Sequence, residues 1–144
     1  MNIMTTASVT TDIHIGPYKI PSNAQNMIMN NFADRNGLKI EVVIPEPIMS
    51  DQLGTTQWLF KDFKFKNIIL CSIHQLPKDK LFQSKILNNL AEVRFNFAIE
   101  GLSGIGHKFL QSCFDEAKYF NNAEIIDSNK TNWIELYEKL KNEI

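Results

Sequence analysis

Two ionisable side chains are the strongest candidates for proton transfer, because each stands at the end of an apolar run. His74 follows Asn67–Ile73 (NIILCSI), and an imidazole, whose ordinary pKa lies near neutrality, suits a general acid or base. Glu100 follows Arg94–Ile99 (RFNFAI), where a lone carboxylate must be exposed, paired or functional. We therefore predict His74 and Glu100 as catalytic residues. The alternative for His74 is a hydrogen bond within its own loop.

A polar loop before the first predicted helix could bind an anion. It runs from Ser8 to Ser22 (SVTTDIHIGPYKIPS), and the helix that follows offers free backbone N–H groups and a partial positive charge. Lys19 would add a formal charge to this site. Ser22 can cap the helix, and Gln25, three residues later, can complete a capping box. The alternative is a solvated loop with an ordinary cap.

The glycine-rich segment Glu100–His107 (EGLSGIGH) is a second candidate for anion binding, because glycines such as Gly101 let backbone amides approach an anion closely. Its GxxGxG order differs from the GxGxxG of dinucleotide sites, and a flexible turn is the alternative. Ser72, two residues before His74, lacks the GxSxG context of a nucleophile but could contact a ligand. The predicted ligand-binding residues are Tyr18, Lys19, Ser22, Gln25, Ser72, Gln75 and Gly101.

Neither a metal site nor a cofactor can be assigned from the sequence. The three histidines and the absence of a paired cysteine motif give no metal-binding spacing, although a magnesium ion bound through Glu100 or Asp12 is an open alternative. Cys71 and Cys113 lie in apolar runs and are predicted to be small buried hydrophobic residues, which fits a reducing compartment.

Strand-like and helix-like segments alternate along the chain and would position these residues. The predicted strands are Asn2–Val9, Leu38–Ile44, Asn67–Ile73, Arg94–Ile99 and a short Glu124–Ile126. The predicted helices begin at Ser22, at Ser50 or Asp51, near Pro77, at Gly104 and at Asn132. This alternation predicts an α/β fold of three layers (α/β/α) with a small, mostly parallel sheet, flavodoxin-like or resolvase-like.

Ligands of such sheets bind at the carboxyl ends of the strands, near the point where the strand order reverses. The polar loops at residues 8–22, 72–75 and 100–107 each adjoin the end of a predicted strand. We therefore expect these loops to lie side by side on one edge of the sheet.

The length of 144 residues fits one domain (1–144), with residues 129–144 as a C-terminal helix packing on it. The net charge of −1 creates no basic field, so nucleic acid is not a predicted partner. No apolar run approaches the ~20 residues that a membrane helix needs, and the N-terminus lacks the pattern of a secretory signal. We predict a cytoplasmic protein.

Three stretches together carry a family resemblance: YKIPSNAQN (Tyr18–Asn26), NIILCSIHQLP (Asn67–Pro77) and RFNFAIEGL (Arg94–Leu102). In this order and spacing they resemble the small bacterial family of sporadic carbohydrate cluster proteins, over roughly Ser8 to Leu102. The resemblance implies an association with gene regions for lipopolysaccharide, capsule or other surface glycans, and it implies no particular reaction. The residues at family-like positions are Pro21, Gln25, Ser72, Leu76, Pro77 and Glu100.

The chain departs from this family before Tyr18, where members tend to carry an arginine and this sequence reads TTDIHIG. Lys19 or His14 would have to replace that arginine if it binds an anion. A fainter likeness, to the catalytic domain of serine recombinases, rests on the glutamine of the first helix and on a strand that ends in glutamate. The serine nucleophile and the arginine cluster of those enzymes are not evident in the sequence.

These observations support two functional hypotheses. The first is a protein of surface-carbohydrate biosynthesis that binds a sugar, sugar nucleotide or sugar phosphate at the strand ends, with His74 and Glu100 transferring protons. The second is a non-catalytic scaffold that docks on a glycan-biosynthesis enzyme or on itself as a homo-oligomer, because Trp58–Phe65 (WLFKDFKF) is rich in aromatic residues. A recombinase-like DNA-binding protein is a third and weaker reading.

Overall fold

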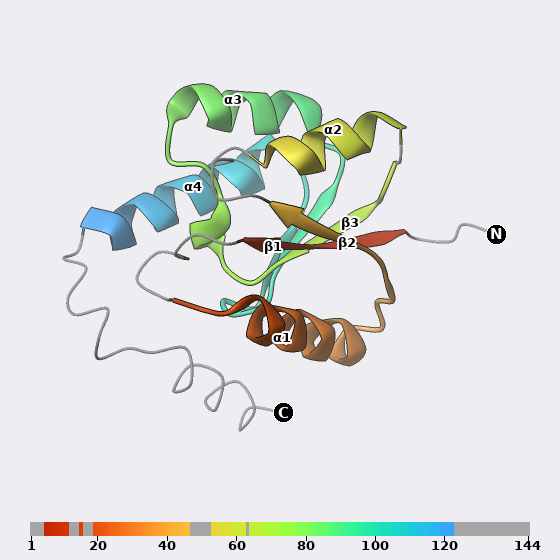
Figure 1. Cartoon of the computed structure of the whole chain (residues 1–144). Coiled ribbons are helices and arrows are strands. Elements are labelled where there is room, and N and C mark those ends of the chain that lie inside the picture. Colours follow the sequence, from red (N-terminus) through yellow and green to blue (C-terminus); the bar gives the residue numbers. More distant parts are fainter. Residues whose placement is uncertain (1–4, 12–14, 16–18, 47–52, 63, 123–144) are drawn as a thin grey trace.

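The protein folds as a five-stranded sheet covered by helices on both faces, as a computed structural model shows (Figure 1). The structure describes residues 5–11, 15, 19–46, 53–62 and 64–122. Along the chain the elements are β1 (Thr6–Thr11), α1 (Ser22–Arg35), β2 (Ile40–Glu46), α2 (Gly54–Asp62), β3 (Asn67–Leu70), the 3₁₀ turn η1 (Ile73–Gln75), α3 (Lys80–Asn89), β4 (Arg94–Phe97), β5 (Leu102–Gly104) and α4 (His107–Asn122).

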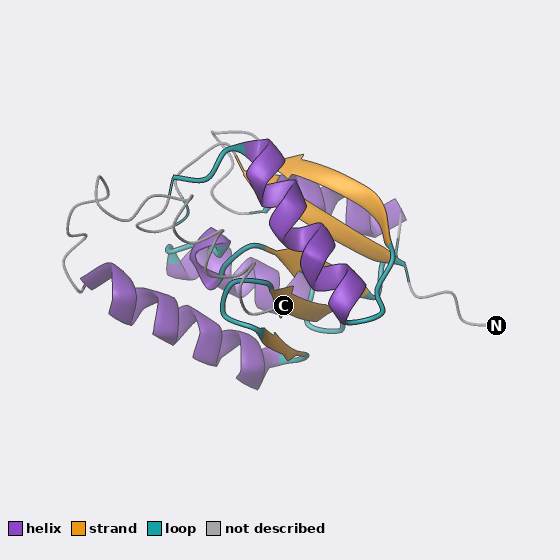
Figure 2. Ribbon diagram, turned by 90° about the horizontal axis from the view of Figure 1, so that it is seen from below, coloured by secondary structure: helices purple, strands orange, loops and turns teal. Residues whose placement is uncertain are grey.

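The strand order is β2-β1-β3-β4-β5, and the order reverses between β1 and β3. The pairs β1–β2, β1–β3 and β3–β4 are parallel, whereas β5 runs antiparallel to β4. Helix α1 lies on one face of the sheet, and α2, α3 and α4 lie on the other (Figures 1 and 2). The predicted three-layer α/β fold with a mostly parallel sheet is confirmed.

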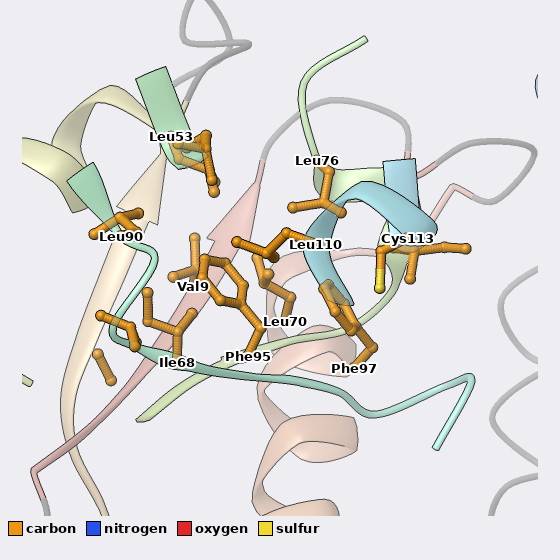
Figure 3. Close-up of a cluster of buried hydrophobic side chains, with 14 of the residues drawn as sticks. Val9, Leu53, Ile68, Leu70, Leu76, Leu90, Phe95, Phe97, Leu110 and Cys113 are labelled. Atoms are coloured by element: carbon orange, nitrogen blue, oxygen red, sulfur yellow. The ribbon is translucent and has the colours of Figure 1, made fainter. Parts of the chain in front are cut away.

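Side chains of the central strands alternate between two apolar cores, as the pleat of a strand requires. Ile68 and Leu70 of β3 pack under α2, α3 and α4, whereas Ile69 and Cys71 pack against α1. All four residues of β3 are buried, which confirms the predicted buried strand, although it ends at Leu70 and not at Ile73, which belongs to η1. Figure 3 shows the larger core, in which Val9, Leu70, Phe95, Phe97, Leu110 and Cys113 gather.

One described strand lies where the sequence predicted none. Glu124–Ile126 lies outside the described residues, and Leu102–Gly104 forms β5 within the segment that the sequence indicated as an anion-binding loop. Gly101, at φ 67°, allows the chain to reverse, and its N–H donates to the Phe97 carbonyl oxygen at 2.9 Å. Because Gly104 pairs with Phe95 in the sheet, α4 begins only at His107 and not at Gly104.

The predicted capping box at the start of α1 is also wrong. Pro21 is the N-cap residue, no side chain caps the helix, and Ser22 is exposed. The Gln25 side chain bonds the backbone of Thr11 and Ile20 and makes no capping bond to the first turn of the helix. Backbone groups that are buried must find a hydrogen-bond partner within the protein, whereas an exposed helix end can bond water. The Gln25 amide therefore bonds the buried groups and not the helix end.

Helix α2 has a cap that the sequence did not reveal. The predicted caps Ser50 and Asp51 lie outside the described residues. The buried carboxylate of Glu46, at the end of β2, accepts hydrogen bonds from Thr55 N (3.1 Å), Thr56 N (2.8 Å) and Thr56 Oγ1 (2.6 Å). A negative charge at this position also complements the helix dipole.

Two further features concern the ends of the chain. The first strand begins at Thr6 and extends to Thr11, beyond its predicted end at Val9. The helix predicted at residues 129–144 lies outside the described part of the chain. Among the helices that are described, none combines the length and apolar character needed to cross a membrane.

Replacing Gly104 by alanine tests the packing of β5 against α4. A Cβ atom at Gly104 would overlap the ring of Phe109, so Gly104→Ala should lower the free energy of unfolding by about 1–3 kcal/mol in urea titration. In a Phe109→Ala background the same substitution should cost less than about 0.5 kcal/mol, because the overlap is gone. An equal loss in both backgrounds would contradict this account.

Candidate functional site

The carboxyl ends of β1, β3 and β4 meet at one edge of the sheet, here called the rim. Two buried glutamine amides tie the rim together. Gln75 accepts a hydrogen bond from Cys71 N (2.6 Å) and donates to the Val9 carbonyl oxygen (3.1 Å), so it joins the end of β3 to β1. Gln25 accepts from Thr11 N (2.9 Å) and donates to the carbonyl oxygen of Thr11 (2.8 Å).

Glu100 connects the end of β4 to the turn η1. Its Oε1 accepts a hydrogen bond from Ile73 N at 2.9 Å, and its Oε2 accepts one from Ser72 Oγ at 2.7 Å. The same Ser72 hydroxyl oxygen accepts from His74 N at 3.2 Å and caps η1. The carboxylate therefore fixes the backbone that carries His74.

Burial raises the pKa of Glu100 above its ordinary value. The hydrogen bonds from Ser72 and Ile73 favour the charged form and offset part of this effect, whereas the Glu116 carboxylate adds to the rise. Glu100 thus keeps its proton to a higher pH than an exposed glutamate does.

The pKa of His74 is shifted in the opposite direction to that of Glu100. Its side chain is 7% exposed, and burial lowers the pKa of its imidazole, with a smaller contribution from the Lys78 ammonium. The imidazole is consequently neutral at neutral pH and is able to accept a proton from a bound molecule.

A pocket of about 370 Å³ opens beside His74, between η1, α3 and α4, and is here called the His74 hollow. Its walls combine an apolar floor with lysines contributed by three different segments of the chain. The lining residues are His74, Leu76, Pro77, Lys78, Lys80, Gln83, Gln111, Phe114, Asp115, Ala117 and Lys118. Three lysines face one aspartate, so the hollow favours an anion.

The residues predicted from the sequence divide into three groups. His74 lines the hollow. Four others lie behind it and bond backbone or hydroxyl groups of the rim: Gln25, Ser72, Gln75 and Glu100. Lys19, Ser22 and Gly101 are exposed and do not line the hollow, and Tyr18 lies outside the described residues.

The structure therefore brings His74 and Glu100 to the same edge of the sheet, as expected, but gives them different surroundings. Glu100 does not line the hollow, and both of its carboxylate oxygens are bonded to protein donors. The crevice expected between β1 and β3 is bridged by Gln75. The hollow opens instead on the side of α3 and α4.

Sequence reasoning missed most of the residues that line the hollow. Lys78 and Lys80 (PKDK) directly follow the loop of His74, and this position could have marked them as cations beside a candidate site. Gln83, Gln111 and Lys118 carry no comparable signal, because exposed polar residues on a helix are usually solvated.

No metal site emerges from the part of the chain that the structure describes. Within residues 5–11, 15, 19–46, 53–62 and 64–122, no group of three or more His, Cys, Asp or Glu side chains is arranged to hold a metal ion.

Comparisons with known proteins support the fold alone. No family model matches the chain, and no curated protein sequence matches it. Among solved structures, the N-terminal catalytic domain of TP901-1 integrase, a serine recombinase, matches with a TM-score of 0.59. The match covers 83% of this chain and 98% of that one at 11% identity, so it shows a shared resolvase-like fold.

No arginine lies at the rim. The sequence contains two arginines, Arg35 at the end of α1 and Arg94 at the start of β4. Since α1 runs back to the start of β2, both lie toward the amino ends of the parallel strands, away from His74. The fold likeness therefore carries no chemistry over to this site.

The raised pKa of Glu100 predicts how stability depends on pH. The folded protein binds this proton more tightly than the unfolded chain. The stability that protonated Glu100 contributes is therefore fully present below its ordinary pKa of about 4.5, and it is lost as the pH rises through the pKa of the folded state. Glu100→Gln keeps an oxygen for Ile73 N and removes the charge. Relative to the variant, the wild-type protein should lose stability as the pH rises above about 4.5.

Urea denaturation at a series of pH values measures this difference, and Glu92→Gln, at an exposed position, is the matched control. A difference in unfolding free energy, wild type minus Glu100→Gln, that is constant with pH or that increases as the pH rises would rule out a buried carboxylate with a raised pKa.

Proposed function

We propose that the protein binds a phosphorylated sugar in the His74 hollow and acts in bacterial surface-carbohydrate biosynthesis in the cytoplasm. The observation that carries the binding proposal is the presence of Lys78, Lys80 and Lys118 around one pocket that also holds a neutral imidazole. The biosynthetic role rests on the sequence resemblance described above.

The lining of the hollow suits both halves of such a ligand. Lysine ammonium groups form charge-assisted hydrogen bonds with phosphate oxygens. The Gln111 amide can donate to and accept from sugar hydroxyls, and the Gln83 amide oxygen can accept from one, since its Nε2 already donates to the carbonyl oxygens of Pro77 and Lys78. The apolar part of the lining, which includes Pro77 and Phe114, can contact the C–H face of a pyranose. A volume of about 370 Å³ lies within the range of small-molecule sites.

If a reaction takes place here, His74 is the group that transfers the proton. Its neutral imidazole lines the hollow and can act as a general base toward a hydroxyl of the bound sugar. Glu100 is then a positioning residue, because it acts on the η1 backbone through Ile73 N and the Ser72 hydroxyl. This role replaces the direct proton transfer that the sequence suggested for Glu100.

A second candidate function, a scaffold or partner subunit of a glycan-biosynthesis enzyme, is favoured by one observation. Trp58 on α2 is 64% exposed, and exposed aromatic side chains are typical anchors of protein interfaces. The two functions are compatible, since α2 and the His74 hollow involve different residues.

Titration with glucose 1-phosphate tests the first proposal. Binding measured by calorimetry should weaken about threefold to tenfold in Lys118→Gln, as expected for one partly exposed charge-assisted bond. Lys85→Gln, at an exposed position of α3 that does not line the hollow, should bind as wild type does. The bound phosphate should also raise the pKa of His74 in an NMR titration, because a nearby negative charge favours the imidazolium.

Absence of binding by glucose 1-phosphate and by a panel of other sugar phosphates would overturn the proposal. Binding that leaves the pKa of His74 unchanged, or that Lys85→Gln weakens as much as Lys118→Gln does, would place the ligand elsewhere.

Size-exclusion chromatography with light scattering tests the second candidate. An oligomer that Trp58→Ser converts to monomer would support an interface on α2, with Asn30→Ser on the exposed side of α1 as the control. A mass equal to that of one chain at all concentrations, together with no complex in mixtures with purified glycan-biosynthesis enzymes, would count against it.

A further inference from the structure

A second hollow of about 490 Å³ lies between α3 and α4, and it is more open to solvent than the first. It is lined by Leu87, His107, Lys108, Gln111, Ser112 and Asp115, and is here called the His107 hollow.

The two hollows adjoin each other, because Gln111 and Asp115 line both of them. These residues are one helical turn apart on α4, and Gln111 Nε2 donates a hydrogen bond to Asp115 Oδ1 at 3.1 Å. The bonded pair forms the border that a ligand longer than either hollow would cross.

We propose that the two hollows form one site for an elongated sugar phosphate, a proposal that rests on the function proposed above. The phosphate-bearing end lies in the His74 hollow, and a second, uncharged unit rich in hydroxyl groups lies in the His107 hollow. This second unit is a further sugar or a nucleoside. Both present a sugar ring with hydroxyl groups, which the polar residues of the second hollow can bond.

The distribution of charge sets the direction of the ligand. Lys78, Lys80 and Lys118 concentrate positive charge at the first hollow, whereas the second is lined by one lysine, Lys108, and one aspartate, Asp115. Phosphate therefore prefers the first hollow, and the second is left for an uncharged unit.

The second hollow also offers suitable contacts. The Asp115 carboxylate and the Gln111 amide retain capacity for further hydrogen bonds beyond the one they share, and the Ser112 hydroxyl can accept one while it donates to the Phe109 carbonyl oxygen at 2.8 Å. Leu87 supplies apolar contact. Such a mixture of a few polar groups around an apolar patch is common in small-molecule sites.

Calorimetry with four probes tests this inference: glucose 1-phosphate, maltose 1-phosphate, UDP-glucose and neutral maltose. At least one of the two longer phosphates should bind about tenfold more tightly than glucose 1-phosphate, and maltose should bind weakest. Tighter binding of maltose 1-phosphate that Ser112→Trp abolishes identifies the second unit as a sugar, and tighter binding of UDP-glucose that the same variant abolishes identifies it as a nucleoside. An advantage that rests only on the second phosphate of UDP-glucose would survive Ser112→Trp, because the phosphates lie in the first hollow.

Ser112→Trp, at an exposed position, fills the second hollow and should reduce the affinity for the longer phosphates to that for glucose 1-phosphate, which itself stays unchanged. Asn30→Trp on α1 is the matched control for a new surface tryptophan. Lys108→Ala is a milder second variant that serves if the tryptophan disturbs α4, and it should weaken the longer phosphates alone.

The outcomes separate the two proposals. If glucose 1-phosphate binds but neither longer phosphate binds more tightly, or if Ser112→Trp and Lys108→Ala leave the longer phosphates unaffected, the elongated site is refuted and the proposed function stands. If no phosphorylated probe binds, both are refuted.

Discussion

The rim depends on one constraint: peptide groups that leave the sheet where parallel strands end remain buried and must find new hydrogen-bond partners. Three side chains meet this requirement in the described structure. Gln25 bonds the last peptide groups of β1, Gln75 joins the end of β3 to β1, and Glu100 holds the start of η1 from the end of β4. The position of His74, and with it the pocket, follows from these bonds.

This use of polar side chains explains why the pocket lies to one side of the place where α/β sheets usually bind ligands. The crevice between β1 and β3, at the reversal of strand order, is spanned by the Gln75 amide. The residues after η1 then pass toward α3 and α4, and the hollow forms where those helices meet the turn. The polar residues nearest the strand ends thus support the site, and lysines from more distant elements give it its charge.

The fold was largely predictable because apolar runs and their spacing are local signals. The buried run at Ile68–Leu70 predicts an interior strand on its own. β5 was missed because a segment of three residues that ends in glycine has no strand signal of its own. It is a strand because Gly104 pairs with Phe95 of β4, which only the folded structure shows. The position of His74 at the rim was predictable from topology, whereas its neighbour Lys118 was not, since only the packing of α4 brings that lysine to the turn.

The reversed direction of β5 has a consequence for the order in which the sheet assembles. Phe95 and Gly104 are close in sequence, so β4 and β5 can pair as a local hairpin with little loss of loop entropy. Ala7 pairs with Ile68 only after a long crossover segment has closed, which is an intrinsically slower event. The β4–β5 hairpin would therefore form early in folding. β3 could then pair with the free edge of β4, and β1 with β3.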